Sequence, residues 1–123
     1  MIRLAIVGSR TFTDYARFRT EVARYCWDAF AEKDEPREIV SGGASGTDAM
    51  AERYAAERGW PLAVFPADWK TWGKAAGILR NRDIVRHADR VIAFWDGQSR
   101  GTAHTIETAR REGVPCCVVE VSA

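Results

Sequence analysis

The chain has 123 residues, of which 46% are hydrophobic and 28% charged, and its formal net charge is +1. This length suits one domain over residues 1–123 with a core that needs no disulfide or metal. The near-neutral charge favours neither a nucleic-acid groove nor a membrane surface, and no apolar run approaches the ~18 residues of a spanning helix. The apolar start is too short for a signal peptide, so we expect a cytoplasmic protein with no membrane partner. The three cysteines, Cys26, Cys116 and Cys117, do not form a CxxC motif, so no metal site is expected.

Apolar runs typical of strands alternate with helical patterns in the first half of the chain. Residues 4–7 predict a buried strand that ends in a glycine-bearing turn. Apolar residues at three- and four-residue spacing predict a helix over 15–30, and the polar segment 33–37 contains a proline that stops helices. Residues 38–41 predict a second strand, and the helix after it ends near Gly59.

The second half continues the alternation after one irregular segment. Residues 61–65 predict a third strand. Residues 66–77 have no clean period and predict a long functional loop or an irregular helix. The remaining pattern is a helix over 78–87, a strand over 90–95, a helix over 102–112 and a strand over 114–121.

Five strands that alternate with helices predict an α/β fold. Strands this apolar indicate a parallel sheet covered on both faces. Right-handed crossovers then give a single Rossmann-like, doubly wound domain with a five-stranded parallel sheet and helices on both faces. For the strand order 3-2-1-4-5, the first and fourth strands flank the crevice in which ligands bind.

Glycine-bearing loops follow the first, second and fourth strands and should converge on that crevice. The second loop, residues 41–48, runs from a strand into a helix N-terminus, where N–H groups and the helix dipole favour an anion. The sequence has no GxxxxGK[ST] motif and no GxGxxG after the first strand, so neither a P-loop ATPase nor ordinary NAD hydride chemistry is expected. The candidate ligand- and phosphate-binding residues are Gly8, Ser9, Arg10, Ser41, Gly42, Gly43, Gly46, Thr47, Asp48, Arg80, Asn81, Ser99, Arg100, Gly101 and Thr102.

Some of these side chains have specific expected roles. Arg10 and Arg80 would clamp phosphate charge. Asp48 would accept a hydrogen bond from a ribose hydroxyl, or serve as an acidic residue in the first helical turn that the helix dipole favours. Trp69 and Trp72 would stack on a base, or else pack in the core or in a dimer interface. The other tryptophans, which we assign to packing, are Trp27, Trp60 and Trp95.

Several stretches, in this order, resemble the SLOG superfamily and most closely its small YspA-like branch. They are Gly8-Ser9-Arg10, Ser41-Gly42-Gly43-Ala44-Ser45-Gly46-Thr47-Asp48, Phe65-Pro66-Ala67-Asp68-Trp69, Arg80-Asn81-Arg82, Ala93-Phe94-Trp95-Asp96-Gly97 and Ser99-Arg100-Gly101-Thr102-Ala103-His104-Thr105. The resemblance covers nearly the whole chain. It implies a Rossmann-like fold and a nucleotide-derived ligand, and relatives of this kind are often homodimers or tetramers. We expect no cofactor.

Two better-understood relatives imply different activities. LOG enzymes are phosphoribohydrolases whose catalytic arginine lies eight residues before an Ala-Asp pair, and Arg80 has that position here. Glutamates follow their Gly-Thr pair where this chain has His104 and Thr105, and the first acidic residue is Glu107. Glu107 is therefore the candidate general acid or base beside Arg80. DprA, which binds single-stranded DNA, shares the glycine loop and an Arg-Asn-Arg run.

The sequence thus predicts a ligand-binding or sensing domain for a nucleotide or nucleotide sugar, AMP-like or ADP-ribose-like. One alternative is a LOG-like hydrolase of an N-glycosidic or phosphoribosyl bond that uses Arg80 and Glu107. The second alternative is a binder of single-stranded nucleic acid, as in DprA.

Overall fold

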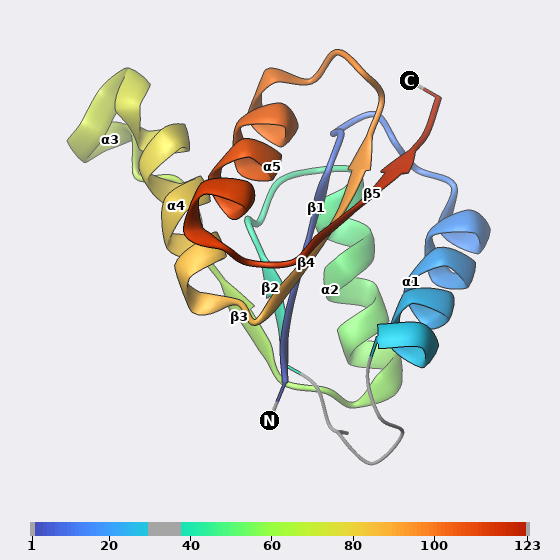
Figure 1. Ribbon diagram of the computed structural model, residues 1–123. Helices are drawn as coiled ribbons and strands as arrows, with labels where there is room; N and C mark the ends of the chain where they lie inside the picture. Colours follow the sequence, from blue (N-terminus) through green and yellow to red (C-terminus); the bar gives the residue numbers. More distant parts are fainter. Residues whose placement is uncertain (1, 30–37, 123) are drawn as a thin grey trace.

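A computed structural model describes residues 2–29 and 38–122 of the chain (Figure 1). Its strands are β1 (Arg3–Gly8), β2 (Glu38–Ser41), β3 (Leu62–Val64), β4 (Arg90–Trp95) and β5 (Cys116–Glu120). Its helices are α1 (Tyr15–Ala29), α2 (Thr47–Arg58), α3 (Trp69–Trp72), α4 (Ala76–His87) and α5 (Arg100–Glu112), with a short 3-10 turn η2 (Gly73–Ala75) before α4. The polar break expected at 33–37 lies outside the described residues.

The strands form one parallel sheet in the order β3-β2-β1-β4-β5, which confirms the predicted topology. The central strand β1 pairs with β2 and with β4, and Leu4 lies opposite Ile39 on one side and Arg90 on the other. The chain changes direction across the sheet at β1, so the carboxyl ends of β1 and β4 flank the switch point. This is the edge at which a ligand crevice is expected.

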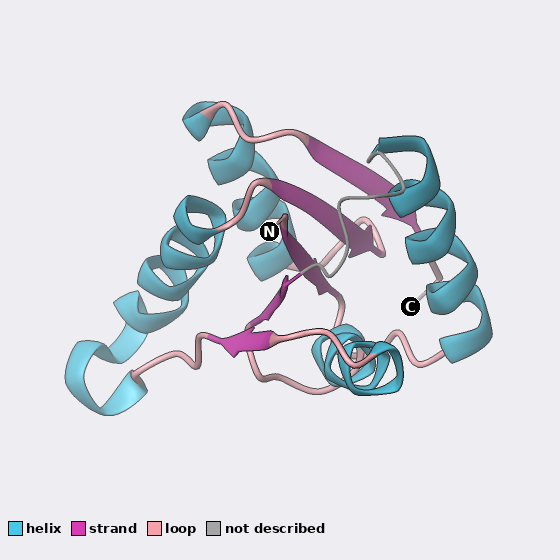
Figure 2. Ribbon diagram, turned by 90° about the horizontal axis from the view of Figure 1, so that it is seen from below, coloured by secondary structure: helices cyan, strands magenta, loops and turns pink. Residues whose placement is uncertain are grey.

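Helices cover both faces of the sheet, as Figures 1 and 2 show. Alternate residues of β1 point to opposite faces: Leu4 and Ile6 enter a core with α1 and α2, whereas Ala5 and Val7 enter one with α4 and α5. The first core contains an aromatic group in which Phe18 and Phe94 stack with ring centroids 5.1 Å apart. The two packed faces hold β1 and β4 rigidly beneath the loops at their carboxyl ends.

The segment 66–77 is the least regular part of the described fold. It contains the one-turn helix α3, the turn η2 and the start of α4 at Ala76, two residues before the predicted helix. The side chain of Asp68 accepts from the N–H of Thr71 at 3.1 Å and caps α3. Figure 1 shows α3 standing clear of the sheet, beyond the start of α4.

One tryptophan assignment is wrong. Trp27 on α1 is 79% exposed and does not pack in the core. Trp60 packs edge-on against Tyr54, and Trp95 is half-buried at the end of β4, so these two follow the prediction. In the described part of the chain, no helix combines the length and the apolar character needed to cross a membrane.

Candidate functional site

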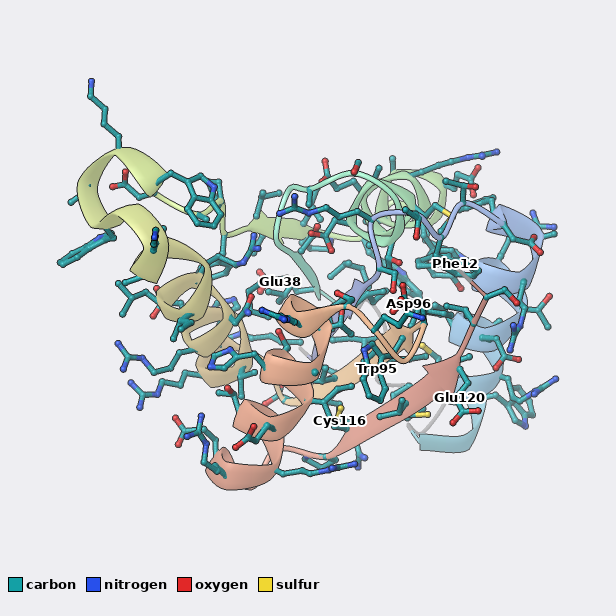
Figure 3. All side chains as sticks on the ribbon, turned by 90° about the horizontal axis from the view of Figure 1, so that it is seen from above. Phe12, Glu38, Trp95, Asp96, Cys116 and Glu120 are labelled. Carbon is teal, nitrogen blue, oxygen red and sulfur yellow. The ribbon has the colours of Figure 1, made fainter. Side chains whose placement is uncertain are left out.

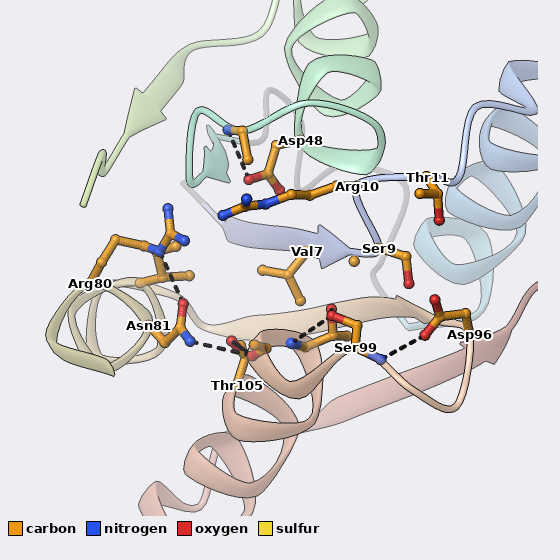
Figure 4. Close-up of a pocket in the computed structure, with 15 residues that line it drawn as sticks. Val7, Ser9, Arg10, Thr11, Asp48, Arg80, Asn81, Asp96, Ser99 and Thr105 are labelled. Carbon is orange, nitrogen blue, oxygen red and sulfur yellow. Dashed lines mark hydrogen bonds between the residues drawn. The ribbon is translucent and has the colours of Figure 1, made fainter. Parts of the chain in front are cut away.

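A cavity of about 330 Å³ opens at the carboxyl ends of β1 and β4, between the first turns of α2 and α5 (Figure 4). It receives side chains from all three glycine-bearing loops and from α4. The predicted residues that line it are Gly8, Ser9, Arg10, Asp48, Arg80, Asn81, Ser99, Gly101 and Thr102. The convergence expected from the topology therefore occurs in the folded chain.

The loop after β2 forms hydrogen bonds within itself. The N–H of Gly43 donates to the hydroxyl of Ser41 at 3.3 Å, and the N–H of Ala44 donates to the carboxylate of Asp48 at 3.1 Å. Asp48 thus closes a five-residue turn in addition to facing the cavity. Two N–H groups that a simple phosphate loop would offer to an anion are already used, so the β2–α2 loop is not a simple phosphate loop.

The start of α2 is fixed to the loop after β1. Thr47 donates to the carbonyl of Ser9 through its N–H at 3.3 Å and through its hydroxyl at 2.9 Å. Gly46 packs against the backbone of Arg10, where a side chain would collide with the carbonyl. Ser41, Gly46 and Thr47 were predicted to bind the ligand, but they do not line the cavity. Gly46 and Thr47 join the loop after β1 to the start of α2, and the Ser41 hydroxyl holds the turn after β2 by accepting from Gly43.

Arg80 reaches from the second turn of α4 to the β2–α2 loop. Its Nη1 donates to the carbonyl of Gly42 at 2.8 Å, and its Nε donates to the side chain of Asn81 at 3.0 Å. Burial lowers the pKa of Arg80, while nearby Asp48 opposes that shift. Burial also raises the pKa of Asp48, against the effects of the Ala44 N–H and the charge of Arg80. Buried Asp48 and half-buried Arg80 form an oppositely charged pair that is not in salt-bridge contact.

Arg10 is the more accessible of the two cations. It forms no hydrogen bond or salt bridge with any described residue, and its side chain is exposed. In Figure 4 it extends from the β1 loop across the cavity toward Arg80. The positive charge of Arg10 lowers the pKa of Arg80, as expected for like charges in proximity. Both guanidinium groups therefore act on the same side of the cavity.

The loop after β4 presents the start of α5. One carboxylate oxygen of Asp96 accepts from the N–H groups of Gln98 at 2.9 Å and Ser99 at 2.8 Å, and these bonds lower the pKa of Asp96. Ser99 caps α5 by accepting from the N–H of Thr102, and the indole of Trp95 donates to the Ser99 carbonyl at 3.0 Å. Figure 3 shows Trp95 and Asp96 side by side at the end of β4. First-turn N–H groups have no acceptor within a helix, so this end favours an anion.

Ser9 has a buried hydroxyl that finds no partner. The residue is 1% exposed, and its Oγ makes no hydrogen bond with any described group. Figure 4 shows it turned toward Asp96, close enough to contribute slightly to the lowered pKa of that carboxyl, although the geometry falls short of a hydrogen bond. A buried hydroxyl without a partner is destabilising. Its position on the cavity wall leaves a hydrogen-bonding capacity that a ligand can satisfy.

Asn81 connects α4 to α5 inside the cavity wall. It is 7% exposed, and its amide group donates to the carbonyl of Gly101 at 3.3 Å while its oxygen accepts from Arg80. The same amide nitrogen lies 3.3 Å from Nδ1 of His104. Asn81 therefore fixes the distance between Arg80 and the first turn of α5.

A second compartment of about 300 Å³ adjoins the first over α3 and the β2–α2 loop. It shares Arg10, Ala44 and Arg80 with the first cavity. The residues that line only this compartment are Gly42, Gly43, Ser45, Pro66, Ala67 and Trp69. Of the two tryptophans predicted as base-stacking candidates, Trp69 lines the compartment and Trp72 does not.

Besides Ser41, Gly46 and Thr47, three further predicted residues line neither compartment. Glu107 is exposed on α5 and lines neither compartment, because it is one and a half turns beyond Thr102. Arg100 is likewise exposed at the start of α5, and Trp72 is 58% exposed on α3. The carboxylates that do line the first cavity are Asp48 and Asp96. Glu107, the predicted general acid or base, therefore does not line the cavity that holds Arg80.

Sequence reasoning also missed residues that line the first cavity. Thr105 is one helical turn beyond Gly101 and donates to its carbonyl at 3.1 Å, so helical spacing from the glycine could have identified it. Asp96 directly follows a buried strand at the switch point, which is also a readable signal. Thr11 and Ala44 line the cavity through loop conformation, for which the sequence has no comparable pattern.

Comparisons with known proteins agree with this architecture. Residues 2–72 match the family model described as YspA, cpYpsA-related SLOG family. The chain is also similar to the Gene 61 protein of Mycobacterium phage D29, with 38% identity over 125 residues that cover 94% of each chain.

Solved structures of DNA processing protein A show the same fold. The Streptococcus pneumoniae protein aligns with a TM-score of 0.73 and 24% identity over 99% of this chain, and the Helicobacter pylori protein with a TM-score of 0.67 and 23% identity over 95%. This chain spans 51% and 64% of those two chains, respectively. Because the family model spans more than half of the chain and the phage relative nearly all of it, the chain belongs to the YspA, cpYpsA-related SLOG family.

Proposed function

We propose that residues 1–123 form a single nucleotide-binding domain that binds a phosphate-bearing, nucleotide-derived ligand, AMP-like or ADP-ribose-like, at the switch point of the sheet. The ligand's phosphate lies between the first turn of α5 and the guanidinium groups of Arg10 and Arg80. The domain acts by binding or sensing this ligand.

The observation that carries this proposal is the unpartnered hydroxyl of Ser9 in the wall of a cavity that also holds two arginines. A cation without a salt bridge, a buried donor without an acceptor and a helix N-terminus all face one space of about 330 Å³. These three features are each satisfied by phosphate oxygens. The volume lies at the lower end of the range found for small-molecule sites.

Calorimetric titration of the protein with AMP and ADP-ribose tests the proposal. We expect binding of at least one of them, and Arg10→Ala should weaken it by tenfold or more, because a hydrogen bond to a charged group contributes roughly 1.5–3 kcal/mol. Arg82→Ala is the matched control, since Arg82 is an exposed arginine of α4 that does not line the cavity. Failure of the wild-type protein to bind any nucleotide, or equal weakening by both substitutions, would overturn the proposal.

The hydrolase alternative requires a different acid from the one the sequence indicated. Asp48 is the buried carboxyl of the cavity, and its raised pKa is a property that catalytic acids often have. Its carboxylate already accepts from Ala44. Release of free base from AMP, lost in Asp48→Asn and retained in Glu107→Gln, would establish hydrolysis with Asp48 as the acid.

A second candidate function, binding of single-stranded DNA, is favoured by the surface of α3 and η2. Trp69 and Trp72 are 54% and 58% exposed, and Lys70 and Lys74 beside them are exposed as well. Exposed aromatic rings between basic residues suit a single strand, whose bases stack and whose phosphates pair with lysine. The Helicobacter pylori structure concerns single-stranded DNA binding by that protein.

Fluorescence anisotropy with a labelled thymidine oligomer separates this candidate from the first. DNA binding on α3 should weaken in both Trp72→Ala and Lys74→Ala and should fall with added salt. Binding that Trp72→Ala leaves unchanged would exclude this surface.

A further inference from the structure

We infer that the second compartment is a base-binding subsite in which Trp69 stacks on the planar base of the ligand. The inference rests on the proposed function and specifies its ligand class. The ligand is a nucleoside 5′-diphosphate ester with two lobes: the base lies in the second compartment, the diphosphate lies between Arg10, Arg80 and the first turn of α5, and the terminal sugar lies in the remainder of the first cavity.

The shared wall of the two compartments carries the positive charge. Arg10 and Arg80 line both spaces, whereas the other charged side chains that line them, Asp48 and Asp96, belong to the first cavity alone. Two cations at a boundary match a ligand whose negative charge is central and whose ends are neutral. A diphosphate linker between two sugars has that charge distribution, and paired guanidinium groups bind its oxygens well.

The two compartments differ in chemistry. The second is lined by Pro66, Ala67 and Trp69 together with backbone of the glycine turn, which suits the flat face of an aromatic base. The first is also lined by hydroxyl, amide and carboxylate groups, among them Asp48, Asn81 and Thr105, which suit the hydroxyls of a sugar. A mononucleotide occupies the boundary and one lobe, so it leaves the other lobe to water.

Gly77 provides an independent reason to assign this role to Trp69. A methyl group at Gly77 would lie 3.3 Å from Cη2 of the Trp69 indole, so the absence of a side chain there lets the ring approach α4. Glycine inside a helix is less stable than alanine, so its presence here has a cost that the packing of the indole offsets. The indole is nevertheless 54% exposed, so it is held by its edge against α4 and remains accessible along the compartment.

Trp72 supplies an internal comparison. It lies in the same four-residue helix and has nearly the same exposure, 58%, but it lines neither compartment. A general effect of exposed indoles on nucleotides would involve both residues. A base subsite in the second compartment involves Trp69 alone.

The test is calorimetric titration of wild-type, Trp69→Ala, Trp69→Phe and Trp72→Ala proteins with ADP-ribose, AMP and ribose 5-phosphate. We expect the wild type to bind ADP-ribose more tightly than AMP. Trp69→Ala should weaken the binding of ADP-ribose roughly tenfold or more, and Trp69→Phe should keep most of the wild-type affinity. Trp72→Ala should leave the affinity for ADP-ribose unchanged. Binding of ribose 5-phosphate, which has no base, should be the same in all four proteins.

The outcomes that overturn the inference are separate from those that overturn the proposed function. If ADP-ribose binds the wild type and Trp69→Ala equally well, or AMP binds as tightly as ADP-ribose, the ligand class is wrong while the phosphate site stands. If Trp69→Ala weakens the binding of ribose 5-phosphate as much as that of ADP-ribose, Trp69 has only a structural role. If none of the three ligands binds the wild type, the proposed function itself fails.

Discussion

The guanidinium group of Arg80 is held against the backbone of Gly42, to whose carbonyl its Nη1 donates at 2.8 Å. A methyl group at Gly42 would lie 2.5 Å from that nitrogen and 2.9 Å from the carboxylate of Asp48. The glycine is required here because a charged pair approaches the backbone, and its φ is not in the left-handed region. The first glycine of the loop thus determines where the cation of α4 lies.

Gly42→Ala should therefore displace Arg80 and weaken nucleotide binding by tenfold or more. We also expect a loss of roughly 1–3 kcal/mol in the free energy of unfolding, as for other overpacked positions. Gly101→Ala is the control for stability, because a methyl group there meets no atom within 4 Å and the residue lies in α5. It should stabilise the protein by about 0.4–1 kcal/mol. Urea unfolding measures the free energy of unfolding of both variants. Equal changes in Gly42→Ala and Gly101→Ala would contradict the close approach of Arg80 to Gly42.

The fold could be predicted because its strands are apolar throughout and its helices are amphipathic. The alternation of strand and helix patterns indicated five parallel strands in a doubly wound sheet, whereas the strand order β3-β2-β1-β4-β5 comes from the structure, because right-handed crossovers allow more than one order. Segment 66–77 was not resolved by pattern because α3 is a single turn capped by Asp68 that buries no side chain. Trp27 was assigned wrongly because residue type predicts burial only on average, and this indole lies on the outer side of α1.

The candidate site was predictable in location and only partly in detail. The topology places Ser9, Arg10 and Gly101 at the switch point, independently of the conformation of the loops. Hydrogen bonding within a loop has no such signature, so the use of the Ala44 N–H by Asp48 could not be read from the sequence. The exposed position of Glu107 follows from its spacing of one and a half turns from Thr102, which can be read from the sequence.

Asp48 should make stability fall as pH rises. Burial raises its folded-state pKa above the ordinary value of 3.8, so the folded protein holds this proton more tightly than the unfolded chain. The stabilising contribution is complete below that ordinary value and is lost as pH rises through the folded-state pKa. Each unit of pKa difference corresponds to about 1.4 kcal/mol. Asp48→Asn, whose side-chain oxygen can still accept from Ala44, should lack this dependence.

Urea unfolding at several pH values measures the effect, with Asp96→Asn as a comparison of opposite sign. The pKa of Asp96 is lowered by the N–H groups of Ser99 and Gln98, so its contribution is present above the ordinary pKa and is lost as pH falls. The stability advantage of wild type over Asp48→Asn should shrink as pH rises above about 4, whereas that over Asp96→Asn should grow as pH rises toward about 4 and then stay level. Parallel curves for all three proteins would contradict the burial of Asp48.

Asn81 should contribute both to the stability of the protein and to its affinity for the nucleotide. Asn81→Ala removes the bond to Gly101 and leaves Nε of Arg80 without its acceptor, which should cost roughly 1–3 kcal/mol. Because Arg80 loses a restraint, nucleotide affinity should fall as well. Arg82→Ala, one residue along on the exposed side of α4, should change neither. A stable Asn81→Ala protein with wild-type affinity would show that Asn81 does not position Arg80.

Two buried hydroxyl groups at the junction of the β1 loop and α2 should respond in opposite ways to removal. Thr47 is fully buried, and its hydroxyl donates to the carbonyl of Ser9 at 2.9 Å. Thr47→Val keeps the shape and loses this bond, so it should destabilise the protein by about 0.5–1.5 kcal/mol. The hydroxyl of Ser9 has no partner to lose among the described residues. Ser9→Ala should therefore leave the free protein as stable as the wild type or slightly more stable.

The effects of the two substitutions on ligand binding should be the reverse of their effects on stability. If the Ser9 hydroxyl is kept unpaired for a phosphate or sugar oxygen, Ser9→Ala weakens nucleotide binding, whereas Thr47→Val affects it only through stability. Thermal unfolding with and without saturating ADP-ribose measures both effects, because ligand binding to the folded state raises the unfolding temperature. The ligand-induced rise should be smaller in Ser9→Ala than in the wild type and unchanged in Thr47→Val. A Ser9→Ala protein that is destabilised without ligand would mean that its hydroxyl already has a partner in the free protein.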